Sequence, residues 1–145
     1  MDSPFGLLAE LTYRCPLACA YCSNPVNMAE YTDELSTDEW RRVLAEAADL
    51  GVLQCHLSGG EPLLRRDIVD IAAAAHDAGL YTNLVTSALG LSRARAEQLR
   101  AVVDHVQAVP VFNVVITHRA MMRRPAVGGL GRMSPAAVHE SLCRI

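Results

Sequence analysis

Residues 36–58 read STDEWRRVLAEAADLGVLQCHLS, and this stretch decides the fold. Ser36 and Glu39 have the spacing of a capping box, so a helix is expected to begin after Ser36. Its apolar face follows at helical spacing through Trp40, Val43, Leu44, Ala47 and Leu50. Gly51 can end a helix in the left-handed conformation, and residues 52–58 then read as a β-strand. A helix followed at once by a strand predicts α/β structure.

The same alternation of strand and helix recurs on both sides of this stretch. Strands are predicted over residues 6–12 and 80–86, and Gly79 ends a second helix whose apolar stripe is Ile68, Ile71, Ala72 and Ala75. A third helix is expected from the Ser92 cap through Leu99, Val102 and Val103, followed by a fourth strand beginning at Val106 and Gln107. Gly51 and Gly79 lie 28 residues apart, and one βα unit of a barrel takes roughly 31 residues. The expected fold class is therefore α/β, an incomplete TIM-type (β/α) barrel of about three to four units, with right-handed crossovers.

Length and composition limit the classes of protein. The chain has 145 residues, of which 51% are hydrophobic, and a complete (β/α)₈ barrel needs about 250 residues. The formal net charge of −3 gives no support for nucleic-acid binding. No uncharged apolar run reaches about 18 residues, so no membrane span is expected. The first ten residues lack a basic segment, so no secretory signal is expected, and the predicted location is the cytoplasm.

The charges divide the chain into two parts. Residues 1–117 carry eight Arg and fifteen acidic residues, whereas residues 118–145 carry five Arg and Glu140 alone. The βα rhythm also fails after Val103, because residues 109–117 read as a strand with no helix before it. Residues 119–131 suggest a loop, and Ser134 and Pro135 can cap a short last helix. We therefore expect a first unit over residues 1–107 and a divergent tail over residues 108–145.

Three of the five cysteines lie in one short loop after the first predicted strand. Cys15, Cys19 and Cys22 have the spacing C-x₃-C-x₂-C, which can turn three thiolates toward one point. Thiolates suit zinc or iron–sulfur clusters. Structural zinc needs four protein ligands, and the fourth would have to be distant, such as His56 or Cys55. The remaining alternative is three incidental thiols, and Cys55 is itself expected in the core.

With Tyr21 before its last cysteine, this loop resembles the signature of radical S-adenosylmethionine (SAM) enzymes. The longer run from Leu8 to Pro25 is similar to the branch of that family that works in pyrroloquinoline quinone (PQQ) biosynthesis, and the similarity continues to about Gln107. The resemblance implies that residues 1–107 are the N-terminal half of a radical SAM core. It also implies that the three cysteines hold three irons of a [4Fe–4S] cluster and that SAM binds the fourth.

Two further loops agree with the resemblance. Ser58, Gly59, Gly60 and Glu61 end the second predicted strand, where paired glycines let the backbone approach a ligand closely. In the family this Gly-Gly-Glu-Pro segment holds the amino group of SAM, so the resemblance implies cofactor-binding roles for these four residues and for Tyr21. Thr86 and Ser87 follow the third strand, where cofactor contacts are expected. The alternatives are an ordinary β-to-α turn for the first loop and a cap or turn role for Ser87.

The resemblance further implies a reaction and its partners. In the PQQ branch, reductive cleavage of SAM generates a radical that leads to a carbon–carbon bond between Glu and Tyr of a small precursor peptide. A peptide chaperone presents that substrate, and an electron donor reduces the cluster. Members of this branch are much longer than 145 residues, so we expect a truncated enzyme. The alternatives are another peptide-modifying radical SAM enzyme and a non-catalytic remnant that binds an iron–sulfur cluster or zinc.

Overall fold

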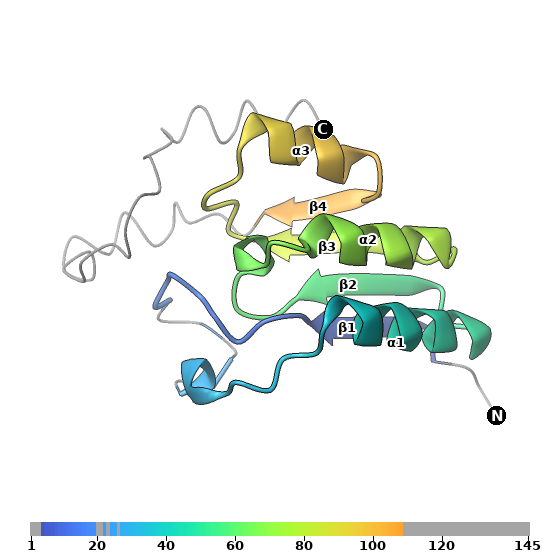
Figure 1. Ribbon diagram of the computed structural model, residues 1–145, viewed down its shortest axis with the longest axis horizontal. Coiled ribbons are helices and arrows are strands. Elements are labelled where there is room, and N and C mark those ends of the chain that lie inside the picture. Colours follow the sequence, from blue (N-terminus) through green and yellow to red (C-terminus); the bar gives the residue numbers. More distant parts are fainter. Residues whose placement is uncertain (1–3, 20–21, 23, 26, 109–145) are drawn as a thin grey trace.

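The computed structural model describes residues 4–19, 22, 24–25 and 27–108. Strands and helices alternate along them as β1 (Gly6–Glu10), α1 (Thr37–Asp49), β2 (Gln54–Ser58), α2 (Ile68–Asp77), β3 (Tyr81–Thr86), α3 (Arg93–Arg100) and β4 (His105–Ala108) (Figure 1). Two short 3₁₀ turns, η1 (Met28–Glu30) and η2 (Pro62–Leu64), lie in the connections after β1 and β2.

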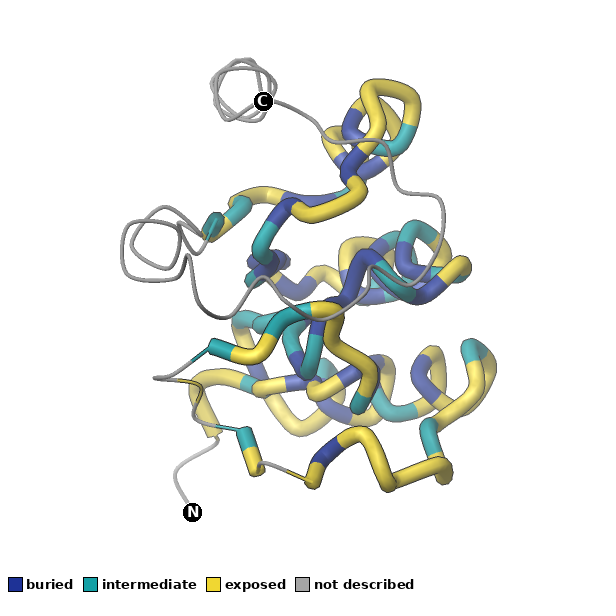
Figure 2. Tube along the Cα trace, turned by 90° about the vertical axis from the view of Figure 1, so that its left-hand side faces the viewer, coloured by how far each residue is buried: buried dark blue, intermediate teal, exposed yellow. Residues whose placement is uncertain are grey.

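The four strands form one parallel sheet in the order β1-β2-β3-β4. Leu8, His56, Asn83 and His105 are aligned in one row across it. All three α-helices lie on the same face of the sheet: in Figure 1, α1 and α2 lie in front of the strands and α3 lies above β4, and in Figure 2 the helices lie to one side of the sheet. Repeated right-handed crossovers produce this one-sided arrangement. The predicted α/β class and its partial barrel are confirmed.

The hydrophobic core lies between the helices and the sheet. Cys55 and Leu57 alternate along β2 and are fully buried, as period-two alternation requires of the face toward the helices. The helices meet them with buried apolar residues that include Leu44, Ile68, Ile71, Ala72 and Ala75. Burying each large aliphatic side chain stabilises the fold by roughly 1.5–3 kcal/mol. The core therefore fixes the sheet on which the loops of the site are mounted.

The helix boundaries confirm most of the predictions and correct two. The Ser36–Glu39 capping box is present. Leu50, however, is the C-cap of α1 and is 67% exposed, because the chain turns away at Gly51, where φ is +89°. The helix expected to continue through Val102 and Val103 ends at Arg100. The chain must reverse there so that His105 can pair with Asn83, and Val103 is buried from the turn rather than from the helix.

Several predictions lie outside the described residues: Tyr21, the strand over residues 109–117, the loop over residues 119–131 and the helix expected after Ser134. The divergent tail over residues 108–145 therefore stays a prediction, apart from Ala108, which ends β4. Within the part of the chain that the structure describes, no helix is long and apolar enough to cross a membrane.

Candidate functional site

The loops that follow β1, β2 and β3 meet at one edge of the sheet. The strands are parallel, so their carboxyl ends all lie on the left in Figure 1, where the three connections emerge. The loop after β1, residues 11–36, is called the cysteine loop below because it carries Cys15, Cys19 and Cys22. The predicted site residues after the three strands are therefore brought to the same edge, which is where barrels of this type build their sites.

The Glu61 carboxylate joins the loops after β2 and β3. It is 1% exposed, and its Oε1 accepts hydrogen bonds from the Leu63 N–H at 3.0 Å and the Thr86 hydroxyl at 2.5 Å. Its Oε2 accepts from the Ser87 N–H at 2.8 Å and the Ser87 hydroxyl at 2.5 Å. Four donors are what a buried carboxylate needs in place of water. Glu61 therefore fixes Thr86 and Ser87 against the turn that carries it.

Thr86 and Ser87 also shape their own turn. The Ala88 N–H donates to the Thr86 hydroxyl at 2.9 Å, and the Leu89 N–H donates to the Ser87 hydroxyl at 3.3 Å. The turn role considered for Ser87 is thus present in the structure. A cofactor role for Thr86, Ser87 and Glu61 stays a prediction. Their side chains are hydrogen-bonded to one another, so a cofactor would contact them as one preformed group.

The paired glycines form a close-fitting seat for the cysteine loop. The Gly60 N–H donates to the Thr12 carbonyl at 2.7 Å, and the Glu61 N–H donates to the Arg14 carbonyl at 2.8 Å. A Cβ on Gly59 would lie 2.6 Å from the Thr12 carbonyl oxygen, and a Cβ on Gly60 would collide with the Arg14 carbonyl oxygen. Gly59 has φ +120°, which L side chains rarely adopt. The sequence Gly-Gly is therefore required for backbone-to-backbone contact with the segment that leads into Cys15.

A side chain from the far part of the cysteine loop adds to this contact. The Asn24 side-chain N–H donates to the Gly59 carbonyl at 2.9 Å. Met28, in η1, is buried, and its methyl group would be 3.0 Å from a Cβ on Gly60. The turn after β2 thus holds the cysteine loop both before Cys15 and after Cys22.

Glu34 closes the base of the cysteine loop. Its Oε1 accepts from the Thr12 hydroxyl at 2.7 Å and from the Tyr13 N–H at 2.9 Å. Burial acts to raise the pKa of Glu34, but these hydrogen bonds and the charges of Arg14 and Arg65 hold that pKa below its ordinary value. The carboxylate therefore stays charged and ties the end of the loop to its beginning.

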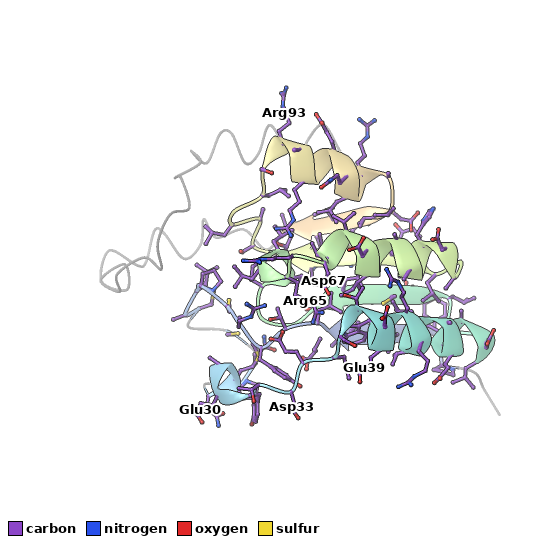
Figure 3. All side chains as sticks on the ribbon, viewed as in Figure 1. Glu30, Asp33, Glu39, Arg65, Asp67 and Arg93 are labelled. Carbon is purple, nitrogen blue, oxygen red and sulfur yellow. The ribbon has the colours of Figure 1, made fainter. Side chains whose placement is uncertain are left out.

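Arg65 and Arg95 brace the same edge from the side of α2 and α3. Arg65 is buried, and it donates to the Leu11 carbonyl at 2.8 Å and to Asp67 at 2.7 and 3.0 Å; Figure 3 shows Arg65 and Asp67 side by side where α2 begins. Arg95 donates to the carbonyls of Leu63 at 2.8 Å and Arg65 at 2.5 Å. A guanidinium has five donors, so one side chain can satisfy several carbonyls of an irregular loop.

The three thiols offer a donor set that fits an iron–sulfur cluster. Cys15 and Cys22 are exposed and Cys19 is half-buried, so all three can be reached from solvent. Burial raises the pKa of Cys15, a hydrogen bond from the Leu17 backbone opposes this rise, and the charges of Glu61, Cys19 and Cys22 add to it. Burial and the charge of Cys22 raise the pKa of Cys19 as well. Thiolates that repel one another in this way favour a shared cation.

No group of three or more His, Cys, Asp and Glu side chains among the described residues is arranged to hold a metal ion. The fit of the three cysteines to an iron–sulfur cluster therefore rests on the kind and spacing of the donors and on the contact of their loop with Gly59 and Gly60. Zinc with His56 as a fourth ligand gains no support from the contacts of His56, because its Nδ1 lies 2.9 Å from the Asn83 amide nitrogen. Cys55 is buried within β2, as predicted for a core residue.

Comparison with known proteins gives the family. The family model described as the radical SAM superfamily matches residues 9–121. The chain belongs to the radical SAM superfamily. The matched region contains the cysteine loop, the Gly-Gly-Glu-Pro turn and the β3 loop, all of which the structure brings to one edge of the sheet.

Relatives and solved structures agree with this membership of the radical SAM superfamily. The chain is 59% identical to the PqqA peptide cyclase of Rhizobium meliloti (strain 1021) over 105 residues, which cover 72% of this chain and 28% of that protein. It is similar to Streptococcus suis SuiB bound to its precursor peptide SuiA, with 27% identity, a TM-score of 0.61, and coverage of 70% of this chain and 23% of SuiB. SuiB bound to SAM matches with 26% identity, a TM-score of 0.57, and coverage of 71% and 22%. The chain spans less than a third of the length of the curated relatives it matches.

The motif residues of this radical SAM chain were found from sequence, and the residues that hold them in place were not. Asn24, Glu34, Arg65 and Arg95 make the contacts that fix the loops. Apart from Asp67, which is two residues from Arg65, their partners lie between 21 and 54 residues away along the chain. The signal that could have drawn attention to Arg65 is its place one turn after Glu61, close to a motif already singled out.

Proposed function

We propose that this chain is the cofactor-binding half of a peptide-modifying radical SAM enzyme of the PqqA peptide cyclase type. The observation that carries the proposal is the seating of the cysteine loop on the Gly59–Gly60 turn, at the edge where β1, β2 and β3 end. The 59% identity to a PqqA peptide cyclase over 105 residues supports the same assignment.

Cys15, Cys19 and Cys22 would hold three irons of a [4Fe–4S] cluster and leave the fourth open to the amino and carboxylate groups of SAM. When bound, the cluster and SAM supply reductive cleavage of the sulfonium and a radical that abstracts hydrogen. The part of the protein is to hold the three thiols in one loop and to keep that loop against the turn after β2. Tyr21, which lies outside the described residues, is proposed to contact the cofactor beside the loop.

SAM would lie over Ser58, Gly59, Gly60, Glu61, Thr86 and Ser87. The hydrogen bonds of Glu61 support this proposal, because they hold the loops after β2 and β3 as one surface. Both Glu61 oxygens already have protein donors, so we propose that Glu61 orients the backbone of the turn and the two hydroxyls. The absence of side chains on Gly59 and Gly60 lets the turn lie directly against the backbone of the cysteine loop, so the proposed cluster ligands and the proposed SAM surface are held together.

The proposed reaction is a carbon–carbon cross-link between Glu and Tyr of a small precursor peptide. Two findings support a peptide substrate: the name PqqA peptide cyclase of the relatives, and the similarity to SuiB, which was crystallised with a precursor peptide. A peptide chaperone and an electron donor are proposed as partners. Residues that would bind the peptide are expected in the part of the relatives' length that this chain does not span.

Anaerobic reconstitution with iron and sulfide tests the proposal. We expect about four irons and four sulfides per chain, and 5′-deoxyadenosine after chemical reduction in the presence of SAM. Cys15→Ser, Cys19→Ser and Cys22→Ser should each abolish both signals, whereas Cys55→Ser, a change at a core cysteine, should leave the iron content of folded protein unchanged. A protein that binds zinc and no iron after reconstitution would contradict the proposed function.

The exposed thiols of the cysteine loop support a second candidate function, because thiolates bind either an iron–sulfur cluster or zinc. The chain would then bind a cluster, or zinc, without turnover. Reconstitution separates the two candidates, because a [4Fe–4S] cluster with no 5′-deoxyadenosine would identify the non-catalytic form. Production of 5′-deoxyadenosine with no cross-linked PqqA peptide would instead favour a different peptide substrate.

A further inference from the structure

Asn24 lies two residues after Cys22 and links the second half of the cysteine loop to the turn after β2. Its side-chain N–H donates to the Gly59 carbonyl at 2.9 Å, across 35 residues of sequence. Among the described residues, no other side chain that follows Cys22 in this loop forms a hydrogen bond with the Gly59–Gly60 turn. One hydrogen bond therefore joins the part of the loop after the cysteines to the turn.

The Gly59 carbonyl and the Gly60 N–H belong to one peptide unit, and both of these polar groups have a partner in the cysteine loop. The Gly60 N–H donates to the Thr12 carbonyl at 2.7 Å, whereas the Gly59 carbonyl accepts from Asn24. In a planar trans peptide the N–H and the C=O point in opposite directions. Thr12 and Asn24, which stand before and after the three cysteines, therefore hold the same peptide plane from opposite sides.

The two sides of this contact differ in how many hydrogen bonds they contribute. Before Cys15, residues 11–14 make three backbone hydrogen bonds with residues 58–61, at 2.9, 2.7 and 2.8 Å. After Cys22, Asn24 makes one. Loss of the Asn24 amide would therefore leave the loop seated on the turn, while the Gly59 carbonyl would lose the partner that fixes its direction. The orientation of the peptide plane can thus be changed without unseating the loop.

The backbone that carries Asn24 is itself restrained. Pro25 follows it, and a residue before proline is confined largely to extended conformations. The Pro25 carbonyl accepts from the Met28 N–H at 3.1 Å, and the Met28 side chain is buried. The Asn24 amide is therefore held toward the turn by its own neighbours in sequence, as a residue that positions another group must be.

We propose that Asn24 is a positioning residue, which orients the Gly59–Gly60 peptide unit against the cysteine loop and so aligns the proposed SAM surface with the proposed cluster ligands. The inference rests on the proposed function and adds to it a residue outside the cysteine and Gly-Gly-Glu-Pro motifs. An amide suits this task, because it donates to a carbonyl and places no charge beside the thiolates. Its loss weakens SAM binding and leaves iron binding intact, because the three cysteines and residues 11–14 are unchanged.

Two substitutions of Asn24 test the proposal in the full 145-residue chain after reconstitution with iron and sulfide. Asn24→Asp keeps the shape and removes the donor, and Asn24→Ala removes the donor without adding charge. The matched control is Asn27→Asp, because Asn27 is exposed in the same loop and its side chain makes no cap hydrogen bond to η1. Equilibrium dialysis with SAM should show about fivefold weaker binding in both Asn24 variants, as expected for one lost hydrogen bond, at unchanged iron content. Asn24→Gln, which keeps a donor on a longer side chain, should recover part of the affinity.

Two results would overturn the inference while leaving the proposed function in place. If both Asn24 variants bind SAM as tightly as Asn27→Asp does, the hydrogen bond does not align the SAM surface. If they lose iron in proportion to SAM, Asn24 only stabilises the loop. A wild-type chain that binds neither iron nor SAM contradicts the proposed function, and hydrogen exchange in the cluster-free chain then decides on Asn24. The Gly60 N–H should exchange faster in Asn24→Ala than in the wild type, and equal rates overturn the inference.

Discussion

Replacing Gly60 by alanine should separate the cysteine loop from the turn that holds it. The added Cβ would collide with the Arg14 carbonyl oxygen and lie 2.7 Å from the Arg14 carbonyl carbon. These are backbone atoms, so no side-chain rotation can relieve the overlap. The Met28 methyl group, 3.0 Å away, is the only one of these neighbours that can move on its own. The loop must therefore leave the turn.

The cost follows from the contacts that would be lost. Three hydrogen bonds join loop and turn, at 2.7, 2.8 and 2.9 Å. At about 1 kcal/mol each, their loss lowers the free energy of unfolding by about 3 kcal/mol. The measurement is urea unfolding of the full chain, followed by iron content after anaerobic reconstitution. We expect Gly60→Ala to lose stability and to retain less iron than the wild type.

Gly79→Ala is the control for this experiment. Gly79 has φ +80°, but a Cβ there would meet nothing within 4 Å. Its cost is the left-handed backbone conformation alone, roughly 1–2 kcal/mol, and iron binding should not change. If Gly60→Ala unfolds at the same urea concentration as Gly79→Ala and binds iron as the wild type does, the cysteine loop is not seated on this turn.

Three further predictions concern the residues that brace the site. The Arg65 guanidinium lowers the pKa of Asp67 from 3.8 to about 2, so the charged Asp67 adds about 2 kcal/mol to the free energy of unfolding above pH 4. This stabilisation should be lost as the pH falls from 4 to 2. Urea unfolding midpoints of Asp67→Asn should show neither the stabilisation nor this pH dependence. Arg95→Ala removes donors to three backbone carbonyls and should lower the free energy of unfolding by about 2 kcal/mol in the same assay. The control Arg93→Ala, at an exposed side chain that projects from the molecule in Figure 3, should lower it by less than about 0.5 kcal/mol. Equal losses in the two variants would contradict a role for Arg95 in holding the loops. Burial raises the pKa of Cys55 to about 12, so iodoacetamide at pH 8 should modify the exposed cysteines of the cysteine loop and leave Cys55 intact until the chain unfolds, as peptide mass spectrometry would show.

The secondary structure was predictable because its signals are local. The Ser36–Glu39 capping box and the stop glycines each involve residues a few positions apart, and they mark real helix ends. The two errors came from extending an apolar stripe by one step. Leu50 and Val103 continue the helical spacing, but the chain leaves the helix at both places in order to begin the next strand.

The site was predictable only as far as its motifs extend. Spacing identified the three cysteines, the family resemblance identified the glycine pair, and the parallel sheet places their loops at one edge. Glu34 and Arg65 were not predictable, because a glutamate on a loop and an arginine before a helix are ordinary at the level of sequence. Their importance arises from contacts with the backbone of residues 11–13, at the start of the cysteine loop, up to 54 residues away. Only the folded chain brings these residues together.

The strand order has a consequence for how the chain folds. Each strand pairs with the next one in sequence, but the connection from β1 to β2, residues 11–53, is about twice as long as the connection from β2 to β3, residues 59–80. Doubling a loop adds about 0.6 kcal/mol of closure entropy, so β1 is the last strand expected to join the sheet. A metal on Cys15, Cys19 and Cys22 would tie together only eight of the 43 residues of this connection, so most of its closure entropy would remain. The late pairing of β1 is therefore a property of the chain itself, with or without a bound metal.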